Sequence, residues 1–234
     1  MAGADSRPPH AVARLRDVVA RRETRPRLDR GEACKPRCPG CRLAPALCLC
    51  ASRASVPARA GVCLLMGEFE ALKPSNTGWL VADVVPDTHA FAWSRTQVDP
   101  ALTALLDDPA WQPVVVFPGE FAPRGRVITE LVPDAARRPL FILLDGTWAE
   151  ARKAFRKSPA LDRFPVLSLA PAQPSRYELR QASHAHHLCT SEVAALCLAL
   201  AGDAPAARAL DEALALFRER TLSAKRNPPA GLRA

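Results

Sequence analysis

The sequence predicts an α/β fold, a mostly parallel sheet with helices on both faces, preceded by a small cysteine-rich segment. Short apolar runs alternate with stretches of helical period over residues 54–234, as in parallel sheets. The 23 prolines among 234 residues argue against a bundle of long helices. Four cysteines crowd into residues 38–50. We therefore expect an N-terminal unit over residues 1–53 and a second, α/β unit over residues 54–234.

Composition restricts the class of protein. With 48% apolar residues the chain can fill a core. No apolar run approaches the roughly 20 residues needed to cross a bilayer, and the N-terminus lacks a secretory apolar region. The arginine-rich start resembles a transit peptide, but Asp5 and Asp17 speak against that. We expect a cytoplasmic protein with no membrane association, and the sequence implies no protein partner.

The positive charge of the chain is concentrated at its N-terminus. Residues 1–53 hold 12 basic and 5 acidic residues, a net charge of +7, whereas residues 54–234 hold 20 and 19, a net charge of +1. A basic block attached to a nearly neutral globule favours nucleic acid as the partner. The alternative is a solubilising arm whose arginine bias partly reflects genome composition.

The N-terminal block begins with a stretch of helical period. Residues 10–23 are expected to form a basic amphipathic helix, and residues 24–37 an extended basic connector. The apolar side of the helix would consist of Val12, Leu15, Val18 and Val19.

Four cysteines follow in a Cys-x2-Cys…Cys-x-Cys arrangement: Cys38, Cys41, Cys48 and Cys50. Four thiolates suit tetrahedral zinc, which would order a segment too short to fold by itself. An iron–sulfur cluster uses the same ligands, and Cys34 is a possible fifth thiol; reactive redox thiols are the third alternative. The remaining cysteines lie in apolar surroundings and are interpreted as buried thiols: Cys63, Cys189 and Cys197.

The second unit alternates strands and helices. Apolar runs predict strands at residues 61–66, 88–93, 113–117, 140–144 and 166–169. Residues 68–75 are expected to form a polar loop, and residues 120–139 a loop or a hairpin. Helices are expected after Asn76-Thr77-Gly78 and after Asp99-Pro100, where proline takes the first helical position.

Two helices are expected near the C-terminus, after a polar segment at residues 175–180. Thr190 would cap the first of them, and the last would run from Asp203 to about Lys225. The predicted core positions of the first are Val193, Leu196, Cys197 and Leu200, and those of the last are Leu210, Leu214 and Phe217.

Residues 140–158 form the stretch around which the chain is organised. A short strand buried on both faces leads into the turn Asp145-Gly146, and Thr147 stands three residues before Glu150, the spacing of a capping box. The helix would bury Trp148, Ala151 and Phe155 and expose Arg152, Lys153, Arg156 and Lys157. In α/β sheets this edge binds ligands. The alternative is an ordinary strand-to-helix turn.

The Asp-Gly-Thr-Trp turn at residues 145–148 resembles the signature of the DTW-domain family, the tRNA-uridine aminocarboxypropyltransferases, and its bacterial form most closely. The resemblance covers about residues 10–225. It also rests on the cysteine run and on further matching stretches: residues 73–78 (Lys-Pro-Ser-Asn-Thr-Gly), 91–96 (Phe-Ala-Trp-Ser-Arg-Thr), 115–118 (Val-Val-Phe-Pro), 150–153 (Glu-Ala-Arg-Lys) and 189–194 (Cys-Thr-Ser-Glu-Val-Ala).

The resemblance implies a SPOUT-like fold with a C-terminal trefoil knot and S-adenosylmethionine as the donor. It implies transfer of the 3-amino-3-carboxypropyl group to N3 of a uridine in tRNA, in the variable loop, with release of methylthioadenosine. The implied catalytic residues are Asp145, Thr147 and Trp148. The implied donor-binding residues are Glu70, Asn76, Thr77, Gly78, Phe117, Pro118, Leu144, Gly146, Cys189, Thr190 and Glu192. The expected RNA-binding residues are Arg95, Arg152, Lys153, Arg156 and Lys157.

The role of Asp145 stays open at this point. It could be the base that accepts the N3 proton, a ligand of the donor's ammonium, as Glu70 could be, or a residue that orients Thr147 and the turn. Trp148 could stack on a base or on adenine, or belong to the core.

This chain departs from the family pattern at two positions. Relatives often have arginine at the position of Trp79 and a basic residue at that of Glu178, so charge is lost near the expected site. Other arginines could compensate: Arg95, Arg176 and Arg180. The histidines that match no family motif are interpreted as part of a surface loop rather than a metal site: His184, His186 and His187.

Three other functions remain as alternative hypotheses. An RNA methyltransferase of the SPOUT type would use the same donor. A non-catalytic RNA-binding module would need only zinc and arginines. A radical, cluster-dependent transferase would require iron.

Overall fold

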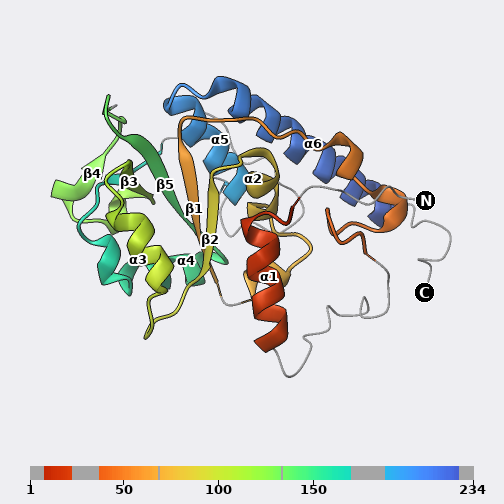
Figure 1. Cartoon of the computed structure of the whole chain (residues 1–234), viewed down its shortest axis with the longest axis horizontal. Helices are drawn as coiled ribbons and strands as arrows, with labels where there is room; N and C mark the ends of the chain where they lie inside the picture. The colour runs from red at the N-terminus through yellow and green to blue at the C-terminus, as the bar shows by residue number, and fades with distance from the viewer. Residues whose placement is uncertain (1–7, 23–36, 68, 133, 170–187, 227–234) are drawn as a thin grey trace.

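The computed structural model describes residues 8–22, 37–67, 69–132, 134–169 and 188–226. Their centre is a six-stranded sheet of order β2-β1-β5-β3-β6-β4 in which every pairing is parallel (Figure 1). The strands are β1 Gly61–Met66, β2 Thr88–Ala92, β3 Trp111–Val116, β4 Val127–Ile128, β5 Arg138–Asp145 and β6 Val166–Leu167. The predicted α/β class and parallel sheet are confirmed.

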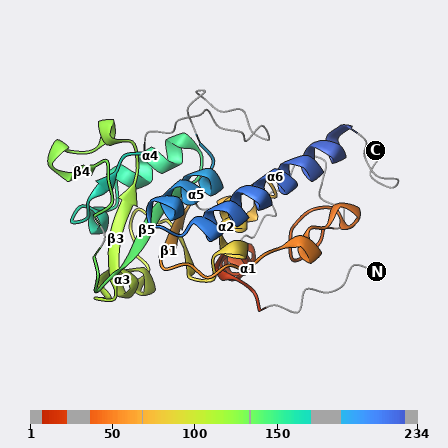
Figure 2. The ribbon, with the colours of Figure 1, turned by 90° about the horizontal axis from the view of Figure 1, so that it is seen from above.

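The helices cover both faces of the sheet (Figure 2). The face bearing α1, α2, α5 and α6 packs on one core cluster, and the face bearing α3 and α4 packs on a second. The bounds are α1 Ala11–Arg22, α2 Gly78–Val84, α3 Pro100–Asp107, α4 Trp148–Arg156, α5 Thr190–Leu200 and α6 Ala204–Arg226.

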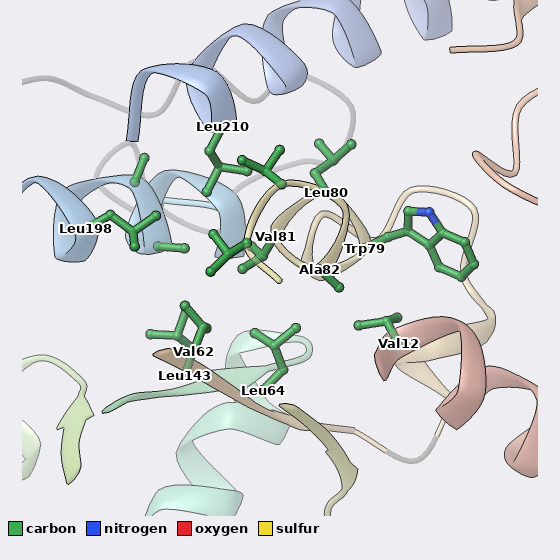
Figure 3. Packing of buried hydrophobic residues seen from close by; sticks show 14 of the residues in the cluster. Val12, Val62, Leu64, Trp79, Leu80, Val81, Ala82, Leu143, Leu198 and Leu210 are labelled. Carbon is green, nitrogen blue, oxygen red and sulfur yellow. The ribbon is translucent and has the colours of Figure 1, made fainter. Parts of the chain in front are cut away.

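The central strands contribute to both cores because successive side chains of a strand point to opposite faces. In β1, Val62 and Leu64 enter the first core and Cys63 and Leu65 the second. Figure 3 shows Leu64 and Leu143 facing Val81 of α2 across the first core. This double burial explains why β1 and β5 are continuous apolar runs.

The N-terminal segment shares the first core. Val12 of α1 and Leu43 and Leu49 of the cysteine segment are buried in it together with α2 and α6 residues. The predicted boundary between residues 53 and 54 stays a prediction, but the packing across it is continuous. None of the described helices is both long and apolar enough to span a membrane.

Several local predictions need correction. Residues 120–139 were expected to form a loop or a hairpin; among the described residues of this segment β4 pairs in parallel with β6, which favours the loop alternative. The expected polar loop at 68–75 contains the 3-10 turn η3 Glu70–Leu72, in which Glu70 and Ala71 are buried. Val18 of α1 is 41% exposed, since the helix contacts the core along a narrower stripe than its apolar residues suggest.

The core face of α5 also differs from the prediction. Cys197 is fully buried as predicted, but Leu196 and Leu200 are exposed, and Ala194 and Leu198 are fully buried in their place. The helix is apolar around most of its circumference, so its period could not select the buried side. The predicted face of α6 is confirmed, with Leu210, Leu214 and Phe217 buried.

Some predictions concern segments outside the described residues. These are the extended connector, Cys34, the polar segment at 175–180 with Arg176, Glu178 and Arg180, and the histidines at 184, 186 and 187. The trefoil knot and the SPOUT-like classification likewise stay predictions, since residues 170–187 are not described.

Candidate active site at the carboxyl edge of the sheet

Asp145 ends β5 in the centre of the sheet, and three other segments hold it. Its carboxylate accepts hydrogen bonds from Nδ2 of Asn76 at 2.8 Å and from the hydroxyl of Thr190 at 2.6 Å. Its carbonyl accepts one from the amide of Gly67 at 2.7 Å, just beyond β1. Asp145 is only 5% exposed. Both carboxylate oxygens therefore have fixed directions.

Asn76 is itself held on both sides. Its Nδ2 also donates to Oε1 of Glu70 at 3.2 Å, and its Oδ1 accepts from the amide of Trp79 at 3.1 Å. Glu70 is 1% exposed and pairs with Nζ of Lys73 at 2.5 Å. Because Lys73 already compensates the charge of Glu70, this geometry favours Glu70 as a support for Asn76 over a role as ammonium ligand.

Gly78 allows α2 to approach Asp145. A Cβ at this position would lie 2.5 Å from Oδ2 of Asp145 and 3.2 Å from Oδ1 of Asn76. No side chain fits there without moving the carboxylate. The requirement for glycine thus comes from the site, because α2 itself would form more readily with alanine.

We predict that Gly78→Ala weakens donor binding and lowers the free energy of unfolding by about 1–3 kcal/mol, as overpacking does in cores. Thermal denaturation and calorimetric donor titration would measure both effects. The control is Gly125→Ala, because nothing lies within 4 Å of a Cβ there. Equal behaviour of the two variants would contradict the close approach.

Thr147 and Glu150 form the predicted capping box at the start of α4. Oε2 of Glu150 accepts from the amide and the hydroxyl of Thr147 at 2.8 and 2.6 Å, and the amide of Glu150 donates to the Thr147 hydroxyl at 3.3 Å. A Cβ on Gly146 would lie 3.2 Å from Glu150. These bonds fix the orientation of Thr147 within the turn.

Trp148 belongs to an aromatic cluster on the other face of the sheet. Its ring stacks on Phe117 with centroids 5.4 Å apart, and Phe117 stacks on Phe155 at 4.5 Å. Leu144, half-buried, packs on the same cluster, and Pro118 is exposed beside it. Trp148 is half-buried, so it contributes to the core and also reaches the surface at the sheet edge.

The N-terminus of α5 completes the Asp145 side. The amide of Cys189 donates to Oε2 of Glu192 at 2.8 Å, and the amide of Ser191 donates to the Thr77 hydroxyl at 3.4 Å. The predicted cap at Thr190 was wrong: Cys189 takes that position, and Thr190 donates to Asp145 instead. Burial and the charge of Glu192 raise the pKa of the Cys189 thiol to about 12, so it is protonated at neutral pH and unsuited as a nucleophile.

The predicted basic face of α4 lies on the surface, with Arg152, Lys153, Arg156 and Lys157 all exposed. The guanidinium of Arg152 lies 4.7 Å from the ring centroid of Phe121, and Nζ of Lys153 lies 5.6 Å from that of Trp93. Arg95 is exposed after β2, at the same edge of the sheet.

The predicted site residues thus separate into two groups. Those on the α2 and α5 face surround the carboxylate: Glu70, Asn76, Thr77, Gly78, Asp145, Cys189, Thr190 and Glu192. Those on the α3 and α4 face surround the aromatic rings: Phe117, Leu144 and Trp148. Sequence reasoning missed Lys73 and Ser191, although both lie within motifs that it quoted. The assignment of catalytic and donor-binding roles stays a prediction.

The four cysteines of the N-terminal segment converge as predicted. Their Sγ atoms all lie within 4.8 Å of one another, and three pairs are 3.4, 3.5 and 3.8 Å apart. Zinc bound tetrahedrally at about 2.3 Å from each sulfur requires sulfur separations of about 3.8 Å. The amide of Leu49 donates to Cys41 Sγ at 3.3 Å. The residues therefore fit a metal ion of this kind.

Trp79, at a position where the resemblance leads us to expect arginine, is buried beside two arginines. The guanidinium of Arg16 lies 5.0 Å from its ring centroid and that of Arg42 5.8 Å, and His10 contacts the ring edge-on at 4.4 Å. Positive charge is therefore present at this place, although it comes from the N-terminal segment.

Comparisons with known proteins identify the family of this chain. The profile of the DTW domain matches residues 35–222. The tRNA-uridine aminocarboxypropyltransferase 2 of Drosophila melanogaster is 34% identical over 107 residues, which are 46% of this chain and 40% of that protein. The chain thus matches less than half the length of this relative. No solved structure matches significantly. Because the profile covers most of the chain and includes the cysteine cluster and the Asp145 edge, the chain belongs to the DTW-domain family.

Proposed function

We propose that this protein transfers the 3-amino-3-carboxypropyl group of S-adenosylmethionine to N3 of a uridine in tRNA. The family and the printed name of the relative support this activity. The structural observation that carries it is the Asp145 carboxylate, which is buried and held from two neighbouring segments beside an exposed basic helix.

The reaction forms a bond between uridine N3 and the γ-carbon of the donor. The bond from that carbon to the sulfonium breaks, its electrons return to sulfur, and methylthioadenosine leaves; the N3 proton passes to a base or to water. The sulfonium activates its methyl group as well, so the enzyme must hold the amino-acid end of the donor in a fixed direction. A site that meets this requirement must offer polar groups in fixed positions.

The Asp145 side of the edge supplies such a site. A carboxylate with both oxygens fixed can bind the donor's ammonium or accept the N3 proton. The fixed oxygens favour binding and orientation, and proton transfer is the second role. The half-buried Trp148 on the other side offers an aromatic surface for a base.

The basic face of α4 is the proposed tRNA contact. Replacing Arg156 and Lys157 by glutamine should weaken tRNA binding and lower its salt slope by about one unit per lost phosphate contact, with donor binding unchanged. These two are chosen because Arg152 and Lys153 also pack on aromatic rings. Binding titrations at several salt concentrations would measure the slope.

The N-terminal block is the competing source of affinity. Deleting α1 would remove Val12 from the first core and uncover Trp79, so substitution is the cleaner test. The exposed pair Arg21 and Arg22, changed to glutamine, is matched in charge to Arg156 and Lys157. If tRNA affinity depends chiefly on the block, this substitution should lower the salt slope of tRNA binding more than the substitution in α4 does. An unchanged salt slope would indicate that the block is only a solubilising arm.

The proposed activity can be tested directly. Purified protein, S-adenosylmethionine and tRNA lacking the modification should yield methylthioadenosine and a nucleoside heavier by the aminocarboxypropyl group. S-adenosylhomocysteine and a methylated nucleoside would identify a methyltransferase instead, and binding without turnover would indicate an RNA-binding module. Nucleoside analysis of tRNA from cells lacking the protein would then identify the uridine, expected in the variable loop of a cytoplasmic tRNA.

A further inference from the structure

Arg42, in the cysteine segment, bonds to the turn that carries Glu70. Its Nη1 donates to the carbonyl of Ala71 at 3.1 Å and its Nη2 to the carbonyl of Leu72 at 2.7 Å. Both carbonyls belong to η3, which begins with Glu70. The planar guanidinium can address two successive carbonyls at once, which an ammonium group cannot do with the same geometry.

The backbone of Arg42 is fixed by the loop of the first cysteine pair. Its amide donates to the carbonyl of Cys38 at 2.9 Å, and its own carbonyl accepts from Nη1 of Arg37 at 3.1 Å. Its φ of +65° lies in the left-handed region, which no other non-glycine residue of the described part adopts. A residue keeps this conformation where its surroundings enforce it.

A short series of contacts connects this loop to the carboxylate. Arg42 holds η3, Glu70 at the start of η3 holds Asn76, and Asn76 donates to Asp145. We propose that Arg42 is a positioning residue through which the four-cysteine segment fixes Asn76 and the Asp145 edge. Its effect on donor binding rests on the proposed function, whereas its effect on η3 does not.

The segment that presents Arg42 has little regular structure of its own. Between residues 37 and 53 it contains only the 3-10 turns η1 Pro45–Leu47 and η2 Cys50–Ser52. Its shape depends on the convergence of Cys38, Cys41, Cys48 and Cys50. Loss of a metal there would release the Arg42 loop. Because Arg42 bonds to η3, that turn should loosen as well.

Hydrogen–deuterium exchange of residues 69–77 tests the first step without any donor. Arg42→Gln should keep its metal, measured by elemental analysis, and exchange these amides about 10- to 100-fold faster, since bonds from a charged donor contribute that much to local stability. Arg16→Gln is the matched control, because Arg16 lies over the same Trp79 ring but bonds to Asp17 and Pro39 rather than to η3. Chelator-treated wild-type protein should show the same faster exchange.

Donor titration tests the second step. Arg42→Gln should weaken S-adenosylmethionine binding about tenfold, and the double variant with Asn76→Ala should bind no more weakly than Asn76→Ala alone, because Arg42 acts through Asn76. If wild-type protein binds no donor, the proposed function fails while the exchange result still decides the role of Arg42.

Two results would overturn the proposal. One is exchange of residues 69–77 within twofold of wild type in folded Arg42→Gln. The other is additive loss of donor affinity in the double variant. If Arg42→Gln does not fold, Arg42→Lys takes its place: it keeps the charge but can bond only one of the two carbonyls, and η3 should still exchange faster than in the Arg16→Gln control.

Discussion

Asp145→Asn should reduce aminocarboxypropyl transfer, and if Asp145 is the base the loss should be about 100- to 10,000-fold, the range typical for the loss of a catalytic acid or base. The substitution removes the charge that would hold the donor's ammonium or accept the N3 proton. Single-turnover transfer to tRNA and calorimetric donor titration, measured on the same preparation, would give the rate and the affinity separately.

The fold should survive this substitution. An amide at this position can still accept from Nδ2 of Asn76 through its oxygen, and its NH2 group can donate to the Thr190 hydroxyl, which accepts as well as it donates. Hydrogen bonds to Asn76 and Thr190 can therefore still form, the second with its direction reversed. The control is Asp162→Asn, an exposed acid paired with Arg126, which should leave transfer unchanged.

The two measurements separate the possible roles of Asp145. If it binds the ammonium, donor affinity falls together with the rate, which is the result the fixed oxygens favour. If it is the base, the rate falls while donor and tRNA bind normally. If it only shapes the turn, Asn is tolerated and Thr147→Ala is as harmful. Normal transfer by both Asp145→Asn and Asp145→Ala would show that this edge of the sheet is not the active site.

Cys41→Ala should abolish metal binding, with a wild-type content of about one zinc per chain as the reference. The loss should also lower the free energy of unfolding by about 3 kcal/mol or more. The reason is that the buried Leu43 and Leu49 each contribute about 1.5–3 kcal/mol and are held in the first core by this segment. Elemental analysis and chemical denaturation would measure the two effects.

Another cysteine provides the control for the metal site. Cys63 is fully buried in β1, away from the cluster, so Cys63→Ala should keep the zinc while losing some packing energy. Stoichiometric iron with visible absorption in anaerobically purified protein would contradict the zinc prediction and favour an iron–sulfur cluster.

Local features of the structure could be predicted from the sequence because their causes lie within a few residues. The box between Thr147 and Glu150 needs only a three-residue spacing, and Asp99 caps α3 through the amide of Ala101. The strands β1 and β5, which are buried on both faces, can be recognised in the sequence as continuous apolar runs. The convergence of the four thiols follows similarly from their spacing within 13 residues.

Orientation within the fold could not be predicted in the same way. In α5 almost every side chain is apolar, so the packing of the helix against α6, α2 and β5 decided that Leu198 rather than Leu200 is buried. The strand β6 lies within the predicted apolar run at residues 166–169, whereas β4, which pairs with β6, was not predicted. A strand of two residues has no period to detect.

The sequence by itself determined the family, the parallel sheet, the turn at Asp145 and the cysteine cluster. Only the tertiary structure decided what surrounds that carboxylate. Asn76 lies 69 residues before Asp145 and Thr190 lies 45 residues after it, and Arg42 reaches η3 across about 30 residues. Local periodicity does not encode such distances, because the strand order of the sheet brings these segments to one edge and the packing of α2 and α5 over β5 sets their contacts.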